Sequence, residues 1–177
     1  AERDLSGGIN RCFKLGHSAL IVDHRGSDTS DGNIITFGVK EHLDCVDWVN
    51  YVVKNVNPRA KIIITGISMG AATVLCASGL ELPDNVKGVI ADSPFSTPID
   101  IIETVALDMG IPRAVIKPLA TVAARLFGGF DLHGASAVEA VKNAKVPILI
   151  IHGEDDRFVP CDMGRAIYDA CPEWAEL

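Results

Sequence analysis

The sequence has no surplus of positive charge and no long apolar run. Its 16 Lys and Arg residues are outnumbered by 23 Asp and Glu residues, so the formal net charge is −7. A protein that holds a phosphate backbone needs a basic surface, and this composition therefore argues against nucleic acid as a partner. A membrane-spanning helix needs about 20 apolar residues in succession, and every apolar run is far shorter. We expect no membrane partner.

Cysteines are few and irregularly spaced. There are five of them, an odd number, and no two form a C-x-x-C pair. This pattern argues against a zinc site and against a disulfide framework. We expect reduced thiols in a cytoplasmic setting. Cys45 and Cys76 fall in predicted helices, where they are expected to be small core residues.

What the sequence does contain is an alternation of strand and helix patterns. The 177 residues suit one domain with a sizeable core. Four short runs are rich in Ile and Val and do not alternate with polar residues, which is typical of strands buried on both faces of a parallel sheet. These runs are residues 18–23, 61–66, 86–92 and 146–153. Helical patterns at residues 39–55 and 71–79 lie between them, so we predict an α/β fold.

One connection is much longer than an αβ crossover requires. Residues 94–145 contain helical patterns near residues 99–109 and 113–127. An insertion above the carboxyl edge of a sheet often forms a lid or a substrate wall, although a purely surface insertion fits the same pattern. Its apolar residues suggest a pocket for an acyl group, or simply packing against the body. They are Ile99, Ile101, Ile102, Val115, Ile116, Leu119, Leu126 and Phe127.

The motif G-x-S-x-G stands between the second strand and the following helix, as Gly66, Ser68 and Gly70. In this context the pattern predicts a nucleophile elbow, in which a strained turn projects the serine from the sheet and small residues on either side prevent clashes. The N–H of Met69 would then stabilise an oxyanion. The alternative is a turn serine with no chemical role.

Acidic residues follow the fourth strand, at the edge of the sheet where ligands bind. Glu154, Asp155 and Asp156 all lie in "HGEDDRFVP", residues 152–160, and spacing alone does not choose between them. One of them could orient a histidine, as triad chemistry requires, or all could belong to a solvated acidic turn. Asp92, at the end of the third strand, is a second candidate for the acid.

Three motifs in order resemble the α/β-hydrolase superfamily, in the branch of bacterial serine esterases and prolyl-peptidase-like proteins. They are "VDHRGSDTSDG" (22–32), "GISMGAAT" (66–73) and "PILIIHGEDDRFVP" (147–160). The resemblance implies an α/β-hydrolase fold over residues 1–177, a mostly parallel sheet flanked by helices, with a helical lid at residues 94–145. It selects Asp156 as the triad acid and implies neither metal nor organic cofactor. Asp28 stands where the family's first motif has a glycine.

The triad histidine of the family follows the acid, and this sequence has no histidine after His152. The resemblance thus implies a chain shortened at both ends, and a family strand between the runs at residues 18–23 and 61–66 is also missing. Open sheet edges would favour self-association into a homo-oligomer. Of the remaining histidines, His24 and His133 are the two that geometry could bring near Ser68, whereas His152 is expected to be structural.

By resemblance, the expected function is serine hydrolysis of a small-molecule carboxylic ester through an acyl-enzyme. Thioesterase, peptidase and acyltransferase reactions use the same catalytic groups, so the sequence does not separate them. Serine at the elbow argues against dehalogenase and epoxide hydrolase chemistry, for which related families carry aspartate. A second hypothesis is a non-catalytic member of the fold that binds a ligand or partner, and the missing histidine favours it.

Overall fold

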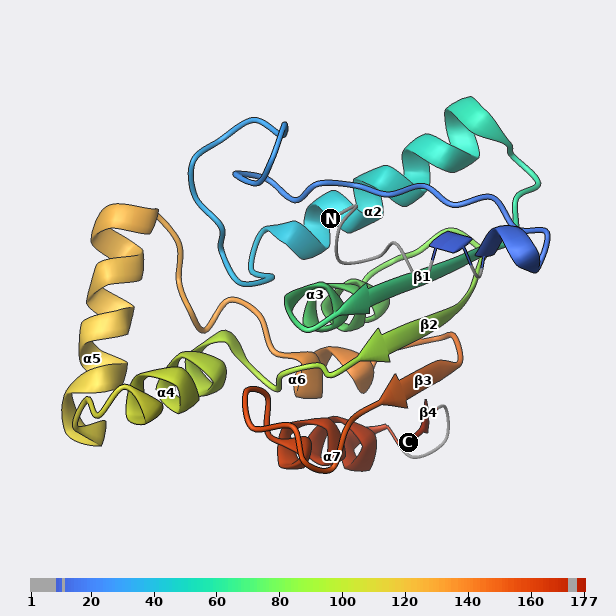
Figure 1. Ribbon diagram of the computed structural model, residues 1–177. Coiled ribbons are helices and arrows are strands. Elements are labelled where there is room, and N and C mark those ends of the chain that lie inside the picture. The colour runs from blue at the N-terminus through green and yellow to red at the C-terminus, as the bar shows by residue number, and fades with distance from the viewer. Residues whose placement is uncertain (1–8, 11, 172–174) are drawn as a thin grey trace. The chain divides into compact units, whose positions relative to one another are not determined.

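The computed structural model describes residues 9–10, 12–171 and 175–177 (Figure 1). The chain divides into two compact units, Ala1–Ile35 and Thr36–Leu177. The second unit contains every strand of the sheet.

In the first unit, residues 9–10 and 12–14 are helical, and residues 17–24 form neither helix nor strand. The prediction of a strand at residues 18–23 is wrong, since no described residue forms a β-ladder with this segment. A strand is defined by hydrogen bonds to a neighbour, and apolar composition alone does not supply one.

The loop that follows shows why the family motif has a glycine where this chain has Asp28. Asp28 adopts a positive φ of 50°. Glycine enters this left-handed region at no steric cost, and aspartate is among the few other residues that tolerate it. The loop is closed by a hydrogen bond from Gly26 N–H to the Asp31 carbonyl (3.0 Å). The substitution therefore preserves the backbone conformation.

Four parallel strands form the sheet in the order β1-β2-β3-β4. They are β1 (Ile62–Ile67), β2 (Val86–Asp92), β3 (Ile148–Ile151) and the two-residue β4 (Ala175–Glu176). The predicted strands at residues 61–66, 86–92 and 146–153 are confirmed, with shorter bounds for the last. No apolar run marks β4 in the sequence.

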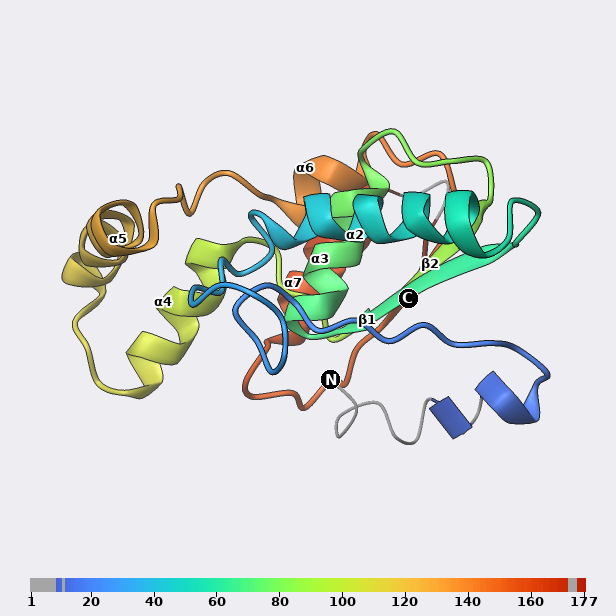
Figure 2. The same ribbon diagram turned by 90° about the horizontal axis from the view of Figure 1, so that it is seen from above.

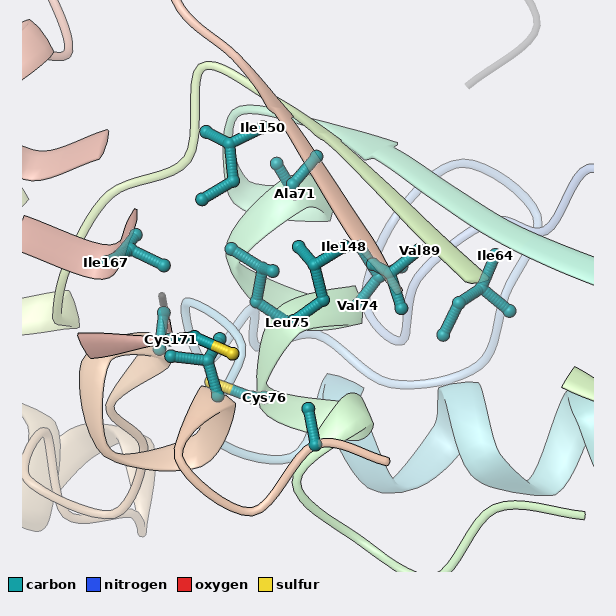
Figure 3. Packing of buried hydrophobic residues seen from close by; sticks show 14 of the residues in the cluster. Ile64, Ala71, Val74, Leu75, Cys76, Val89, Ile148, Ile150, Ile167 and Cys171 are labelled. Atoms are coloured by element: carbon teal, nitrogen blue, oxygen red, sulfur yellow. The ribbon is translucent and has the colours of Figure 1, made fainter. Parts of the chain in front are cut away.

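Helices cover one face of this sheet. They are α3 (Met69–Ser78), α6 (Ala137–Val141) and α7 (Cys161–Ala170). Figure 3 shows Leu75 and Val74 of α3 pointing into a cluster with Ile148 and Val89 of the strands. Small residues in α3 allow close approach, and Ala71 is completely buried. The predicted helix at residues 71–79 is thereby confirmed as the centre of the core.

The opposite face of the sheet is open in the described structure. Ile63 of β1 is 51% exposed and Ile151 of β3 is 47% exposed, whereas Ile64 and Ile150 beside them point to the other face and are buried. The prediction that these strands are buried on both faces is therefore wrong for β1 and β3. The helices α3 and α7, which contact the strands, contribute to the main hydrophobic cluster on the other side of the sheet.

Residues 36–57 begin the second unit with α2 (Glu41–Tyr51), which continues into the π-helical turn η1 (Val52–Val56). The chain becomes extended at Asn57, immediately before Pro58, which is unable to continue a helix. The predicted helix at residues 39–55 is confirmed. This helix packs beside α3, and the two lie next to each other in Figure 2.

The long connection separates into a helical arm and a core helix. The arm comprises α4 (Pro98–Asp108), α5 (Arg113–Ala123) and η2 (Ala124–Gly128), and it stands apart from the sheet in both views (Figures 1 and 2). Glu103 of α4 pairs with Arg113 (3.4 Å) and Lys117 (3.4 Å) of α5. The short helix α6, by contrast, packs into the main core.

The apolar residues of the connection have different surroundings. Ile99, Ile101 and Ile116 are buried, and Ile102 is half-buried. Four others are exposed: Val115, Leu119, Leu126 and Phe127. Packing therefore accounts for some of these residues but not for the outer side of α5.

Burial also determines the chemistry of the cysteines. It raises the pKa of Cys76 to about 12 and that of Cys45 to about 11, so both thiols stay protonated at neutral pH. Of the helices that the structure describes, none combines the length and the apolar character that crossing a bilayer requires.

Candidate active site

Ser68 occupies the sharp turn between β1 and α3. Its backbone has φ 51° and ψ −113°, a conformation that non-glycine residues adopt only when the surrounding structure imposes it. The Ser68 N–H donates to the Asp92 carbonyl at the end of β2 (2.8 Å), and the Ser68 carbonyl accepts from Ala72 N–H in α3 (3.0 Å). The turn is thus fixed at both ends.

Gly66 and Gly70 are brought together by this turn. A Cβ atom on Gly66 would overlap the carbonyl carbon and oxygen of Gly70 and would lie 2.7 Å from the nitrogen of Ala71. Only hydrogen fits between the end of the strand and the start of the helix. The expectation that the elbow needs small flanking residues therefore has a direct steric basis at Gly66.

The first turn of α3 begins directly after Ser68. Met69 is the first residue of the helix, and the N–H groups of a first helical turn have no acceptor within the helix. The helix dipole adds partial positive charge there. These N–H groups are therefore already oriented to donate hydrogen bonds to an oxyanion that forms beside Ser68.

A cavity of about 410 Å³ opens beside Ser68. Ser68 is the one polar side chain among its lining residues, which come from the loop before α2, the elbow, the β2–α4 loop, α4 and the acid loop. The lining residues are Phe37, Ser68, Met69, Phe95, Ile101, Ile102, Val105, Ala106, Met109 and Phe158. The site is therefore an apolar pocket with a single hydroxyl in its wall.

Asp156 is held as an ionised carboxylate in the loop after β3. Its Oδ1 accepts hydrogen bonds from the backbone N–H groups of Val159 (2.9 Å) and Phe158 (2.9 Å). The bond from Val159 is the main reason that the pKa of Asp156 lies below its ordinary value, with a further contribution from Phe158. The group therefore stays charged through neutral pH, as an acid that orients a histidine must.

The strand order gives the separation between the strand that leads to Ser68 and the strand that leads to the Asp156 loop. Ser68 follows β1 and Asp156 follows β3, with β2 between them. Neighbouring strands are about 4.8 Å apart, so two spacings place the ends of β1 and β3 roughly 10 Å from each other. Ser68 and the loop of Asp156 therefore both lie at the carboxyl edge of the sheet, on strands that are not adjacent.

The comparisons with known proteins identify the family of this chain. The profile of the alpha/beta hydrolase fold family matches residues 6–107, which is more than half of the chain. The chain belongs to the α/β-hydrolase family. It is 30% identical over 156 residues to the uncharacterized protein YqkD of Bacillus subtilis, covering 88% of this chain and 51% of that protein. It is 27% identical to the lysophosphatidylserine lipase ABHD12 of Danio rerio, covering 92% of this chain and 42% of that protein.

Solved structures show the same fold. The Pyrococcus furiosus esterase Pf2001 superposes with a TM-score of 0.71 at 24% identity, over 97% of this chain and 62% of that one. Acetyl xylan esterase 1 from Thermoanaerobacterium sp. JW/SL YS485 gives 0.67 at 18% identity, over 97% and 61%. Of the two relatives YqkD and ABHD12, the chain spans about half the length or less. The predicted α/β-hydrolase fold is confirmed.

Within this α/β-hydrolase, His152 has a structural environment. Its Nε2 lies 2.8 Å from the carbonyl oxygen of Val159, so Nε2 carries the proton and donates. The Nδ1 atom is buried and has no hydrogen-bond partner among the described residues. His152 thereby ties the end of β3 to the far end of the loop that carries Asp156, in agreement with the structural role expected for it.

Asp92 lies at the centre of the carboxyl edge. Its carbonyl accepts from Ser68, and its Oδ1 accepts from the Ser93 hydroxyl (3.3 Å). Ser93 has a positive φ of 52°, and its N–H donates to the Ile151 carbonyl (2.7 Å). These bonds link the ends of β1, β2 and β3, so Asp92 helps to hold the three strand ends together at the carboxyl edge of the sheet.

The two candidate histidines have different surroundings, and His133 lies in the same unit as Ser68 but outside the pocket lining. His133 has an exposed side chain, and its backbone N–H donates to Asp131 (3.0 Å). His24 belongs to the first unit, where its carbonyl accepts from Ser27 N–H (3.0 Å). No histidine belongs to the pocket lining given above.

Three aromatic residues of the pocket were not singled out by the sequence analysis. Phe95 follows β2 closely and Phe158 lies in the loop after β3 that carries Asp156, so their places in loops at the carboxyl edge could have indicated them. Phe37 carries no such signal. It has a positive φ of 55°, which is unusual for a bulky residue, and only the folded structure shows it.

Proposed function

We propose that this α/β-hydrolase carries the nucleophile and the acid of a serine hydrolase that acts on carboxylic esters. The observation that carries the proposal is the strained backbone of Ser68, which sets the residue in the wall of an apolar pocket at the first turn of α3. Strain of this kind is maintained where a side chain must point in a direction that a relaxed turn would not give. Relatives named as esterases and as a lipase support a hydrolytic reaction.

In the proposed reaction, Ser68 Oγ attacks the ester carbonyl and its proton passes to a histidine that Asp156 orients. The oxyanion accepts hydrogen bonds from the N–H of Met69 and from a second donor elsewhere in the site. Collapse of the tetrahedral intermediate breaks the bond to the alcohol oxygen, which takes the proton from the histidine. Water then attacks the acyl-enzyme, releases the carboxylic acid and restores Ser68. The arm of α4 and α5 serves as the lid of the pocket.

Asp156 offers a test that separates catalysis from folding. Asp156→Asn keeps an Oδ1 atom that accepts from Val159 and Phe158, so the loop is expected to stay folded. The negative charge is lost, and we expect kcat for a para-nitrophenyl ester to fall by about 10⁴-fold. The measurement compares hydrolysis and thermal unfolding of the wild type and the variant.

Glu154→Gln is the matched control, because Glu154 lies in the same loop and, among the described residues, its carboxylate pairs with Arg165 at 3.9 Å on an exposed surface. It should leave kcat unchanged. Equal losses in both variants would contradict the role of Asp156. A folded wild type that binds the ester without hydrolysing it would support a binding function in place of the enzyme.

A further inference from the structure

The wall that α4 contributes to the pocket is long. Ile101, Ile102, Val105, Ala106 and Met109 line it, and this spacing places them on one side of the helix over two turns. With a rise of about 1.5 Å per residue, the wall extends roughly 12 Å along the helix. The pocket is therefore suited to an extended group.

The two ends of this wall differ. Ile101 packs with Ala72 of α3 and with Phe95, and Met69 also packs against this cluster. This end is therefore the one beside the elbow. Met109, at the other end, is 74% exposed. A group attached at Ser68 would begin in a closed, apolar place and extend along α4 towards solvent.

The lining selects against polar and very small groups. A polar group buried in this pocket would lose water and gain no hydrogen bond along α4. An acetyl group would contact only the part of the wall nearest to Ser68. Each methylene of a longer chain would bury more apolar surface, and this favours an unbranched aliphatic chain.

Phe37, on another side of the pocket, is held by a buried carboxylate. Glu41 is 0% exposed, and its oxygens accept from Thr36 N–H (2.7 Å), the Thr36 hydroxyl (2.6 Å) and Gly38 N–H (2.9 Å). The backbone on both sides of Phe37 is thus bonded to one side chain. His42 adds a bond, since its Nδ1 lies 2.8 Å from the Gly38 carbonyl oxygen and therefore donates.

These bonds keep Glu41 ionised in spite of its burial. Burial by itself would raise the pKa of Glu41, but the hydrogen bonds from Thr36, and also those from Gly38, outweigh it and bring the pKa below its ordinary value. A protonated or amide side chain would place a hydrogen donor against donors. The left-handed backbone of Phe37 therefore depends on the charge of Glu41.

We propose that the pocket beside Ser68 binds an unbranched aliphatic acyl chain, and that Glu41 is a positioning residue that keeps Phe37 in the pocket wall. This inference rests on the proposed function, because it identifies the acyl group of the same ester. It names the substrate class as esters of straight-chain, apolar carboxylic acids.

The test uses binding in the Ser68→Ala variant, so that no chemical step is needed. The ligands are straight-chain methyl ketones, which carry the carbonyl group without a leaving group. We expect the dissociation constant to fall about fourfold per added methylene until the wall is filled. A branched ketone with the same number of carbons should bind more weakly than the straight one. A dissociation constant that does not depend on chain length would overturn the inference.

Glu41→Gln, made in the same background, tests the positioning role. We expect the gain per methylene to fall to about twofold or less, because Phe37 leaves the wall. Phe37→Ala should have the same effect, and the double variant should lose no more than either single one. Asp47→Asn, which removes an exposed carboxylate from the same helix, should retain the full gain.

The gain in affinity per methylene separates a positioning role of Glu41 from a role in stability alone. If Glu41 only stabilised the fold, Glu41→Gln would lower the unfolding midpoint and leave this gain unchanged, and that result would overturn the assigned role. If Glu41→Gln does not fold, Phe37→Ala still decides whether Phe37 forms part of the binding wall. The dissociation constants of the ketones are measured without catalysis. They would therefore still test the acyl-chain pocket if the protein proved not to hydrolyse esters.

Discussion

Ser68→Ala is expected to lower kcat for ester hydrolysis by about 10⁶-fold. In the proposed reaction the hydroxyl oxygen of Ser68 forms the acyl-enzyme, and no other hydroxyl lines the described pocket. The strained turn contains no side-chain hydrogen bond of Ser68 within the described residues, so the substitution removes the nucleophile and leaves the backbone bonds to Asp92 and Ala72. The unfolding midpoint should therefore stay close to that of the wild type.

Ser78→Ala is the matched control for this measurement. Ser78 is buried at the end of the same helix, and its hydroxyl donates to the Leu75 carbonyl (2.7 Å). The variant should lose about 1 kcal/mol of stability and keep its kcat. Hydrolysis that persists in Ser68→Ala at the wild-type rate would contradict the assignment of the nucleophile.

Gly66→Ala is expected to be the most destabilising single change at the site. The new methyl group would overlap the Gly70 carbonyl and approach the Ala71 nitrogen at 2.7 Å, and all of these are backbone atoms. No side chain can move aside to relieve the overlap, so the strand and the helix must separate. We expect the free energy of unfolding to fall by at least about 3 kcal/mol, measured by denaturant titration.

Gly153→Ala provides the comparison, because a Cβ atom there meets only the Asp156 Cβ, at 4.0 Å. Its effect on the free energy of unfolding should stay below about 1 kcal/mol. Similar losses for the two variants would mean that the close approach at Gly66 does not limit the elbow.

The parts of the molecule that sequence predicts well are those with local causes. The strands β1 and β2 follow from runs of Ile and Val, and the elbow between β1 and α3 follows from the sizes of Gly66 and Gly70 on either side of Ser68. The choice of Asp156 over its acidic neighbours came from resemblance alone. The structure adds the physical distinction, since the backbone hydrogen bonds are made to Asp156.

The parts that sequence misses depend on distant contacts. Residues 18–23 have the composition of a strand, but a strand also requires a neighbour, and composition does not reveal whether one is present. The left-handed backbone of Phe37 is fixed by hydrogen bonds to Glu41, which in the sequence looks like any first-turn acid of a helix. Only the folded chain shows that this carboxylate is buried.

The account rests on an activated serine at position 68, and the intact mass of the chain after reaction with a fluorophosphonate tests this most directly. The reagent reports an activated serine without requiring knowledge of the substrate. The account predicts that the wild type gains one phosphonyl group, located on Ser68 by peptide mapping, and that Ser68→Ala gains none. A folded wild type that stays unlabelled, or that is labelled on another residue, would contradict it.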